Sequence, residues 1–111
     1  MRTLLLLAIS ALAFGQTPAQ HTAMLTWTDT QNPTGTTYNV YRAPGLCSGT
    51  PAFVKLASGV TSLTFADATI TVGPWCYQVT ASVSNIEGPP SPQASATVGP
   101  FAPGQILITI K

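Results

Sequence analysis

Few side chains in this sequence could do acid–base or nucleophilic chemistry. The 111 residues include one histidine, three carboxylates and two cysteines. His21 stands at the entry to the first alternating segment, where it is most simply a solvated residue at a strand end. Two carboxylates can together hydrolyse a glycosidic bond, but Asp29, Asp67 and Glu87 are dispersed among turns. Asp29 and Asp67 are more simply acceptors for backbone N–H groups in those turns. We therefore expect no catalysis and no cofactor.

Motifs for common enzyme chemistry are also missing. The sequence has no Gly-x-Ser-x-Gly elbow, phosphate-binding loop or dinucleotide fingerprint. Cys47 and Cys76 could supply a reactive thiol or a metal site. A thiolate nucleophile needs a nearby base and structural zinc needs four ligands, however, and the chain has one histidine. A small hydrolase, or an accessory domain of one, has no residues here to support it, and no metal site is predicted.

The first 15 residues are predicted to be a secretory signal peptide. Arg2 precedes an apolar run over residues 4–14, followed by small and polar residues, which indicates cleavage near Gln16 or after the alanines at 11 and 13. An uncleaved anchor or a buried helix are the alternatives, but the run is shorter than the roughly 20 residues that cross a bilayer. The protein is expected to be secreted or extracellular, with the periplasm as an alternative.

Very few charges remain in the predicted mature chain. They are Arg42, Lys55 and Lys111 against Asp29, Asp67 and Glu87. The chain has too few positive charges to attract nucleic acid or an anionic membrane, so neither is expected as a partner. A surface with so little charge resists self-association poorly.

The rest of the chain alternates in short segments separated by Gly, Pro and Asn turns, which predicts an all-β sandwich. The clearest segment is residues 73–83, in which Trp75, Tyr77, Val79 and Ala81 share one face and Cys76 and its alternates share the other. No helical period survives three turns.

The order of the strands resembles that of a bacterial fibronectin type III domain, over about residues 21–98. The resemblance rests on the segments HTAMLTWT, TYNVYRA, FVKL, LTFAD, WCYQVTA and ASATV. It implies an immunoglobulin-like antiparallel β-sandwich with strands at 22–29, 37–43, 52–57, 62–67, 75–84 and 93–98. The expected core residues are Leu25, Trp27, Tyr38, Val40, Phe65, Trp75, Tyr77, Val79 and Ala81. The predicted domain covers residues 16–98, followed by a linker and tail over 99–111.

Two departures from the family pattern are visible. Family members usually have a tyrosine at Trp75, whose hydroxyl ties the corner before that strand to nearby backbone. We expect packing to hold the corner here. The first strand of the family is short or missing, because only residues 16–20 precede the segment at 22–29 after signal cleavage.

The two cysteines allow one pairing in a secreted chain. In the sandwich that the resemblance implies, Cys47 follows the strand at 37–43 and Cys76 begins its antiparallel neighbour. A Cys47–Cys76 disulfide is therefore expected.

Two places could contact a partner. Asn39 and Tyr41 alternate outward from the core set of their strand, and a polar face carrying an aromatic side chain can recognise a partner. The simpler interpretation is a solvated sheet face. The tail is strongly β-prone, with Ile106, Ile108 and Ile110 on one face. It is expected to fold back on its own domain or to insert into a neighbour in place of the missing strand.

The sequence thus predicts a secreted module that works by adhesion or interaction with a protein or an extracellular surface polymer. The alternative is a structural subunit of an extracellular filament, paired through the terminal strand.

Overall fold

The computed structural model describes residues 4–8, 11–12 and 20–101, all as strands, turns and loops. No helix occurs among them, so none of the described residues forms a helix able to cross a membrane. The strands are β1 (Leu4–Ala8), β2 (Ala11–Leu12), β3 (Gln20–Asp29), β4 (Thr37–Pro44), β5 (Val54–Val60), β6 (Thr64–Thr71), β7 (Gly73–Val83), β8 (Ile86–Glu87) and β9 (Ala94–Val98).

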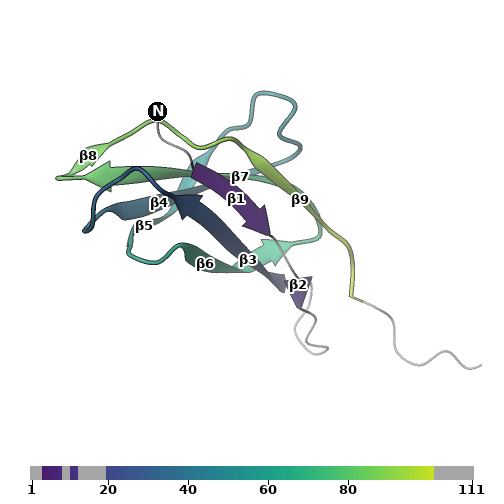
Figure 1. Ribbon diagram of the computed structural model, residues 1–111. Coiled ribbons are helices and arrows are strands. Elements are labelled where there is room, and N and C mark those ends of the chain that lie inside the picture. The colour runs from purple at the N-terminus through teal and green to yellow at the C-terminus, as the bar shows by residue number, and fades with distance from the viewer. Residues whose placement is uncertain (1–3, 9–10, 13–19, 102–111) are drawn as a thin grey trace, which may run out of the picture.

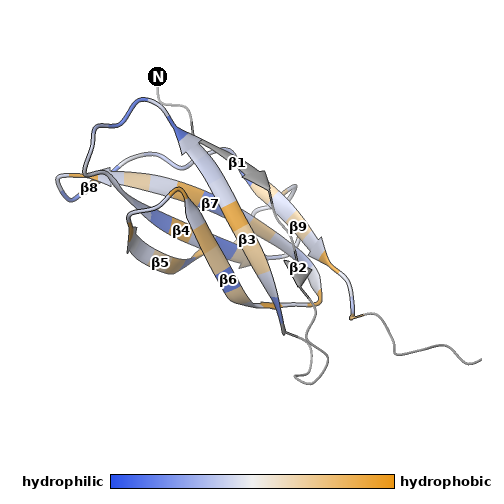
Figure 2. Cartoon of the chain, turned by 60° about the horizontal axis from the view of Figure 1, so that its bottom comes forward, coloured by the Kyte–Doolittle hydropathy of each residue, from blue (hydrophilic) through white to orange (hydrophobic). Residues whose placement is uncertain are grey.

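These strands form two antiparallel sheets. In one, β3 pairs with β6 on one side and with β1 and β2 on the other; in the second, the order is β5, β4, β7, and β7 then pairs with both β8 and β9. Figure 1 shows β3 crossing in front of the β4 and β7 layer. Figure 2 shows bands of alternating hydropathy along β7, as expected for a strand with one buried face, and an apolar stretch in the middle of β3. The predicted all-β sandwich is confirmed.

The core lies between the two sheets. Of the residues expected there, seven are buried and Phe65 and Trp75 are partly buried against them; the seven are Leu25, Trp27, Tyr38, Val40, Tyr77, Val79 and Ala81. Ile70, which the sequence analysis left outside a strand, is also fully buried. It joins the core because β6 continues to Thr71 and not only to residue 67.

The expectation of a short or missing first strand concerns the chain after signal cleavage and stays a prediction, whereas in the uncleaved chain this place is filled. β1 and β2 lie along the outer edge of β3, with Leu4 opposite Asp29 and Leu12 opposite Thr22. The pairing shifts by one residue between Leu6 and Ala8, as a β-bulge does. A run of apolar residues is compatible with an edge strand and also with a signal peptide. Hydropathy alone therefore does not distinguish these two kinds of segment. Whether residues 1–15 are removed remains a prediction.

Trp75 holds the corner before β7 by a hydrogen bond, and not by packing alone as expected. Its indole Nε1–H donates to the carbonyl of Thr71 at 2.8 Å, four residues upstream. The corner therefore keeps the backbone tie that a tyrosine hydroxyl makes in related domains. The indole N–H can replace the tyrosine hydroxyl because it points back to the carbonyl of Thr71.

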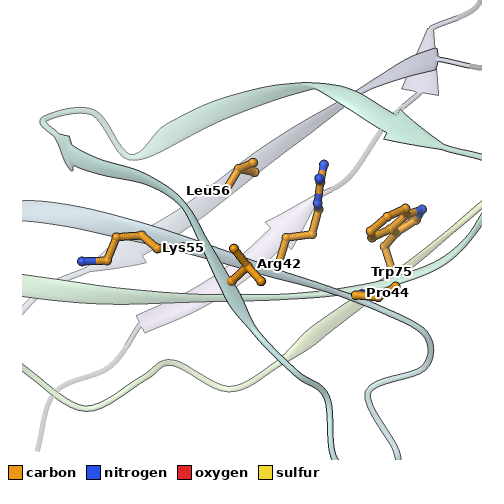
Figure 3. A pocket seen from close by; sticks show the side chains of 6 residues that line it. Arg42, Pro44, Lys55, Leu56 and Trp75 are labelled. Atoms are coloured by element: carbon orange, nitrogen blue, oxygen red, sulfur yellow. The ribbon is translucent and has the colours of Figure 1, made fainter.

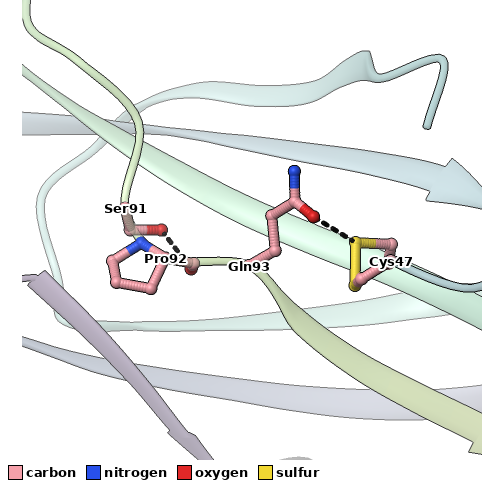
Figure 4. The surroundings of a disulfide bond; sticks show 5 residues. Cys47, Ser91, Pro92 and Gln93 are labelled. Carbon is pink, nitrogen blue, oxygen red and sulfur yellow. Dashed lines mark hydrogen bonds between the residues drawn. A yellow bond between two sulfur atoms is a disulfide. The ribbon is translucent and has the colours of Figure 1, made fainter. Parts of the chain in front are cut away.

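The predicted disulfide between Cys47 and Cys76 is confirmed, with 5.2 Å between the two Cα atoms. Cys76 lies opposite Ala43 on β4, which brings the loop after β4 back to β7. Figure 4 shows Gln93 over the sulfurs, its side-chain oxygen 3.7 Å from Cys76 Sγ. A disulfide sulfur has no proton, so this is a contact and not a hydrogen bond. Cys76 is fully buried, although it alternates away from the core residues of its strand.

A tight hairpin and a proline break connect β7 to β9. Ser84 and Asn85 both have positive φ, 52° and 64°, which is the geometry of a type I′ turn. After the prolines, Ser91 satisfies both backbone groups of Val79 on β7. Val79 N–H donates to Ser91 Oγ at 3.0 Å, and Ser91 N–H donates to Val79 O at 2.8 Å.

Candidate interaction surface

The outer face of β4 carries the two residues that the sequence singled out for contact. In the register of β4 with β7, Asn39 lies opposite Thr80 and Tyr41 opposite Gln78. The register brings the polar side chains of both strands onto one face.

Asn39, however, is not available to a partner, because it is 5% exposed. Its amide donates 3.0 Å hydrogen bonds to Thr80 Oγ1 and to Ser82 Oγ. The polar side chains of this face satisfy one another and thereby cover themselves. Alternation alone gives the face on which a residue lies, but not whether its neighbours cover it. The expectation that Asn39 forms part of a contact surface is corrected.

Tyr41 is partly exposed and belongs to a small polar cluster. Its hydroxyl donates to Glu87 Oε2 at 2.5 Å, and Thr80 Oγ1 donates to the same oxygen at 2.5 Å. These two bonds lower the pKa of Glu87, while the bond to Glu87 is the main reason why the pKa of Tyr41 is raised. The Lys55 ammonium lies 5.8 Å from the Tyr41 ring centroid, at the outer range of a cation–π contact. An aromatic ring held between a cation and a carboxylate is a fixed feature of the surface.

A pocket of about 190 Å³ opens beside the edge strand β5. Its lining residues are Arg42, Pro44, Val54, Lys55, Leu56 and Trp75. In Figure 3, Arg42 and Trp75 stand side by side on one side of the sheet, while Lys55 points away from them. Val54 is 68% exposed at the rim. The pocket therefore joins an exposed apolar rim to an aromatic wall.

Arg42 forms the cationic wall of this pocket and is tied down from three sides. Its Nη1 lies 2.7 Å from Asp67 Oδ2 and donates to Thr69 Oγ1 at 2.8 Å. Its guanidinium carbon lies 4.7 Å from the centroid of the Trp75 ring, a cation–π contact. With so many fixed contacts, the guanidinium is preorganised and its rotamer does not have to be ordered on binding.

Asp67 lies beneath Arg42 and is 2% exposed. It does accept the Thr69 N–H in a turn, at 3.0 Å, and it also accepts the Tyr77 hydroxyl at 2.6 Å. Burial works to raise the pKa of Asp67, but hydrogen bonds from Tyr77, Thr69 and Arg42 outweigh it and lower that pKa below 3.8. Burial, followed by the bond to Asp67, strongly raises the pKa of Tyr77. The buried carboxylate is thus a structural anion that holds Arg42 in place.

The remaining candidates do not gather into a catalytic or metal site. Within the described ranges, no group of three or more His, Cys, Asp or Glu side chains could hold a metal ion. Asp29 accepts the N–H groups of Gln31 and Asn32 in its turn, as expected. His21 is 6% exposed and stacks on Phe101, with 3.9 Å between ring centroids, so its assignment as a solvated strand end is wrong.

Ile106, Ile108 and Ile110 lie outside the described residues. The sequence analysis also missed the pocket formed by Arg42 with Trp75. One signal could have found it: Arg42 has the inward parity of Tyr38 and Val40, and a cation at such a position requires an anion facing it across the sheets. Which residue provides that anion depends on the packing of β6 against β4, and no local pattern contains that information.

Comparison with known structures identifies the fold. A Fn3-like protein from Clostridium thermocellum is 25% identical, with a TM-score of 0.58, over 81% of this chain and 86% of that one. The fold is that of a fibronectin type III domain. The fibronectin type III domain of human fibronectin type III domain containing protein 3 is 14% identical, with a TM-score of 0.60, over 85% of this chain and 86% of that one. The domain from human KIAA0970 protein is 16% identical, with a TM-score of 0.62, over 96% of this chain and 85% of that one.

No protein-family model matches the sequence, and no curated protein matches it either. The likeness to the fibronectin type III fold is therefore a likeness of architecture. Any candidate contact surface must be argued from the side chains of this chain, and those around β5 form its aromatic and cationic pocket.

Proposed function

We propose that the mature protein is a secreted, non-catalytic fibronectin type III-like module of bacterial origin that mediates adhesion or interaction with a protein or an extracellular surface polymer. Fibronectin type III folds commonly serve as non-catalytic interaction modules. The similarity to the Clostridium thermocellum protein supports a bacterial source. The Cys47–Cys76 disulfide supports an oxidising compartment outside the cytoplasm or in the periplasm.

The observation that carries this proposal is the arrangement around β5, an edge strand that pairs, among the described residues, with β4. One side of it holds the Arg42–Trp75 pocket with Val54 exposed at the rim. The other side holds Tyr41 under Lys55. Aromatic and arginine side chains in fixed positions are the usual centres of protein interfaces. Among the residues that the structure describes, no comparable group of acid–base side chains supports an enzyme.

Binding of the labelled mature protein to intact bacterial cells, purified cell-wall polysaccharide and immobilised extracellular proteins tests this proposal. We expect retention on at least one surface and a loss of at least tenfold in the Val54→Asp, Tyr41→Ala double variant. Thr97→Asp, on an exposed position of β9, is the matched control and is expected to bind as the parent does. Absence of retention on every surface, or equal loss in the control, would contradict the proposal.

A second candidate function is a structural subunit of an extracellular assembly. The observation that favours it is the outer edge of β3, which is covered in the full chain by residues from the predicted signal peptide. If those residues are removed, the edge is free to pair with another strand. Measurement of solution size for the exported protein tests this candidate, and a monomer at all concentrations would contradict it.

A further inference from the structure

Two short strands pair with the outer edge of β3. β1 runs antiparallel to it from Asp29 to Thr26, and β2 continues in the same direction from Ala23 to Thr22. Beneath this edge lie Leu25 and Trp27, which are 0% and 2% exposed. The two strands therefore pair with the backbone of β3 along this edge.

Removal of residues 1–15, which the proposed secretion entails, takes these strands away. β3 begins at Gln20, so only residues 16–19 remain ahead of it. Four residues that lead directly into β3 cannot turn back and pair with it. The mature domain is left with unpaired backbone N–H and C=O groups on β3, a row that invites an incoming strand.

The chain contains one segment suited to that place. Gln105-Ile106-Leu107-Ile108-Thr109-Ile110 is about as long as β1 and alternates so that three isoleucines share a face. Paired residues on neighbouring strands lie on the same side of a sheet. An isoleucine opposite Trp27 and another opposite Leu25 would cover the margin of the core.

The position of Phe101 decides whether this segment can come from the same molecule. The Phe101 ring is stacked on His21, at the start of β3, with 3.9 Å between the centroids. An antiparallel donor must enter at the other end, beside Asp29, which in extended strand is about 27 Å from His21. Residues 102–104, which precede the segment, span at most about 11 Å. The chain's own tail therefore cannot replace β1 in its direction.

We propose that residues 105–110 of a second copy of this chain occupy the β3 edge, antiparallel to β3, in the place that β1 holds in the full chain. The inference rests on the proposed secretion and on the second candidate function. Each subunit then gives its tail to one neighbour and receives the tail of another. Such a head-to-tail contact produces a ring when the rotation between neighbours closes and a linear assembly when it does not.

The test uses the full-length gene expressed with export. Intact mass first locates the N-terminus, and light scattering then measures molar mass over a hundredfold range of concentration. The parent is expected to lack residues 1–15 and to reach masses at least threefold above one chain. Ile108→Asp is expected to be a single chain, because the charge would enter the margin of the core. Thr109→Asp places the same charge on the opposite face of the tail and is expected to assemble as the parent does.

A synthetic peptide of residues 104–111 gives a second readout. Added to the Ile108→Asp protein, it is expected to bind one per chain, whereas the same peptide carrying Ile108→Asp is not. Retention of residues 4–8, a parent that is a single chain throughout, or equal behaviour of the two tail variants would overturn the inference. Surface binding by the Val54 and Tyr41 region is measured separately with the Ile108→Asp protein. Its failure would count against the interaction function and leave the strand exchange standing.

Discussion

The Tyr77 hydroxyl donates a 2.6 Å hydrogen bond to Asp67 Oδ2 and thereby joins β7 of one sheet to β6 of the other. Tyr77 is fully buried and Asp67 is 2% exposed, so water does not compete for either group. Because Asp67 also holds Arg42, the bond links the core of the sandwich to the wall of the surface pocket.

Loss of this hydroxyl should destabilise the domain. Tyr77→Phe keeps the ring but removes a hydrogen-bond donor from a buried carboxylate. We expect the free energy of unfolding, measured in urea, to fall by about 1.5–3 kcal/mol. Tyr41→Phe removes a hydroxyl from the exposed Glu87 and is expected to change stability by less than about 0.5 kcal/mol. Equal losses of stability in the two variants would contradict a larger contribution from the hydrogen bond between Tyr77 and Asp67.

Stability is expected to fall in acid. The pKa values of Asp67 and Asp29 are lowered below 3.8 in the folded state, where hydrogen bonds outweigh burial. A carboxylate with a depressed pKa stabilises the fold above its unfolded pKa, and this contribution is lost as pH falls through the folded pKa. Denaturation at pH 7, 4, 3 and 2 should show a decline that begins near 4, and Asp29→Asn should reduce it. A flat profile between pH 4 and 2 would refute this account.

The disulfide should supply a large part of the total stability. It closes a loop with a sequence separation of 29, and chain entropy then gives about 3–4 kcal/mol. The Cys47→Ala, Cys76→Ala double variant is expected to lose that amount in denaturation at neutral pH. Reductant should lower the stability of the parent similarly and leave that of the double variant unchanged. A response of the double variant to reductant would point to another cause.

Substitutions in the β7–β8 turn are predicted to raise or lower the stability of the domain. Ser84 and Asn85 occupy the two positive-φ positions of a type I′ turn, for which Asn-Gly is the preferred pair. Ser84→Asn with Asn85→Gly should raise the free energy of unfolding by up to about 1 kcal/mol, because the strain of a non-glycine residue at positive φ is relieved. Asn85→Val puts a branched residue at positive φ and should lower stability by about 1 kcal/mol or more. A fall in stability with the Asn-Gly pair would contradict the turn assignment.

The sequence predicted most of the strands because alternation of period two survives in each of β3, β4 and β7. Four features lay beyond that pattern. The apolar run at residues 4–8 does not alternate, so nothing in it announces an edge strand. Asn39 alternates outward, but its burial depends on Thr80 and Ser82 from a strand that is distant in sequence.

His21 shows the same limit at the other end of the domain. Its cover is Phe101, which follows the last described strand and reaches it only when the two sheets are packed. The surface pocket likewise depends on Arg42 meeting Asp67 across the sheets. Local periodicity determines which face a residue takes, whereas these contacts depend on how the faces are set against each other.

The cross-link between Cys47 and Cys76 also determines how the domain would respond to tension. A force applied to the two ends of the chain passes from Cys47 to Cys76 through the sulfur bridge, so the intervening loop carries no load even after the sheets separate. A separation of 29 residues corresponds to about 100 Å of extended chain. An unfolded module would therefore lengthen by roughly that much less than its reduced counterpart, which limits the slack in a surface tether built from such domains.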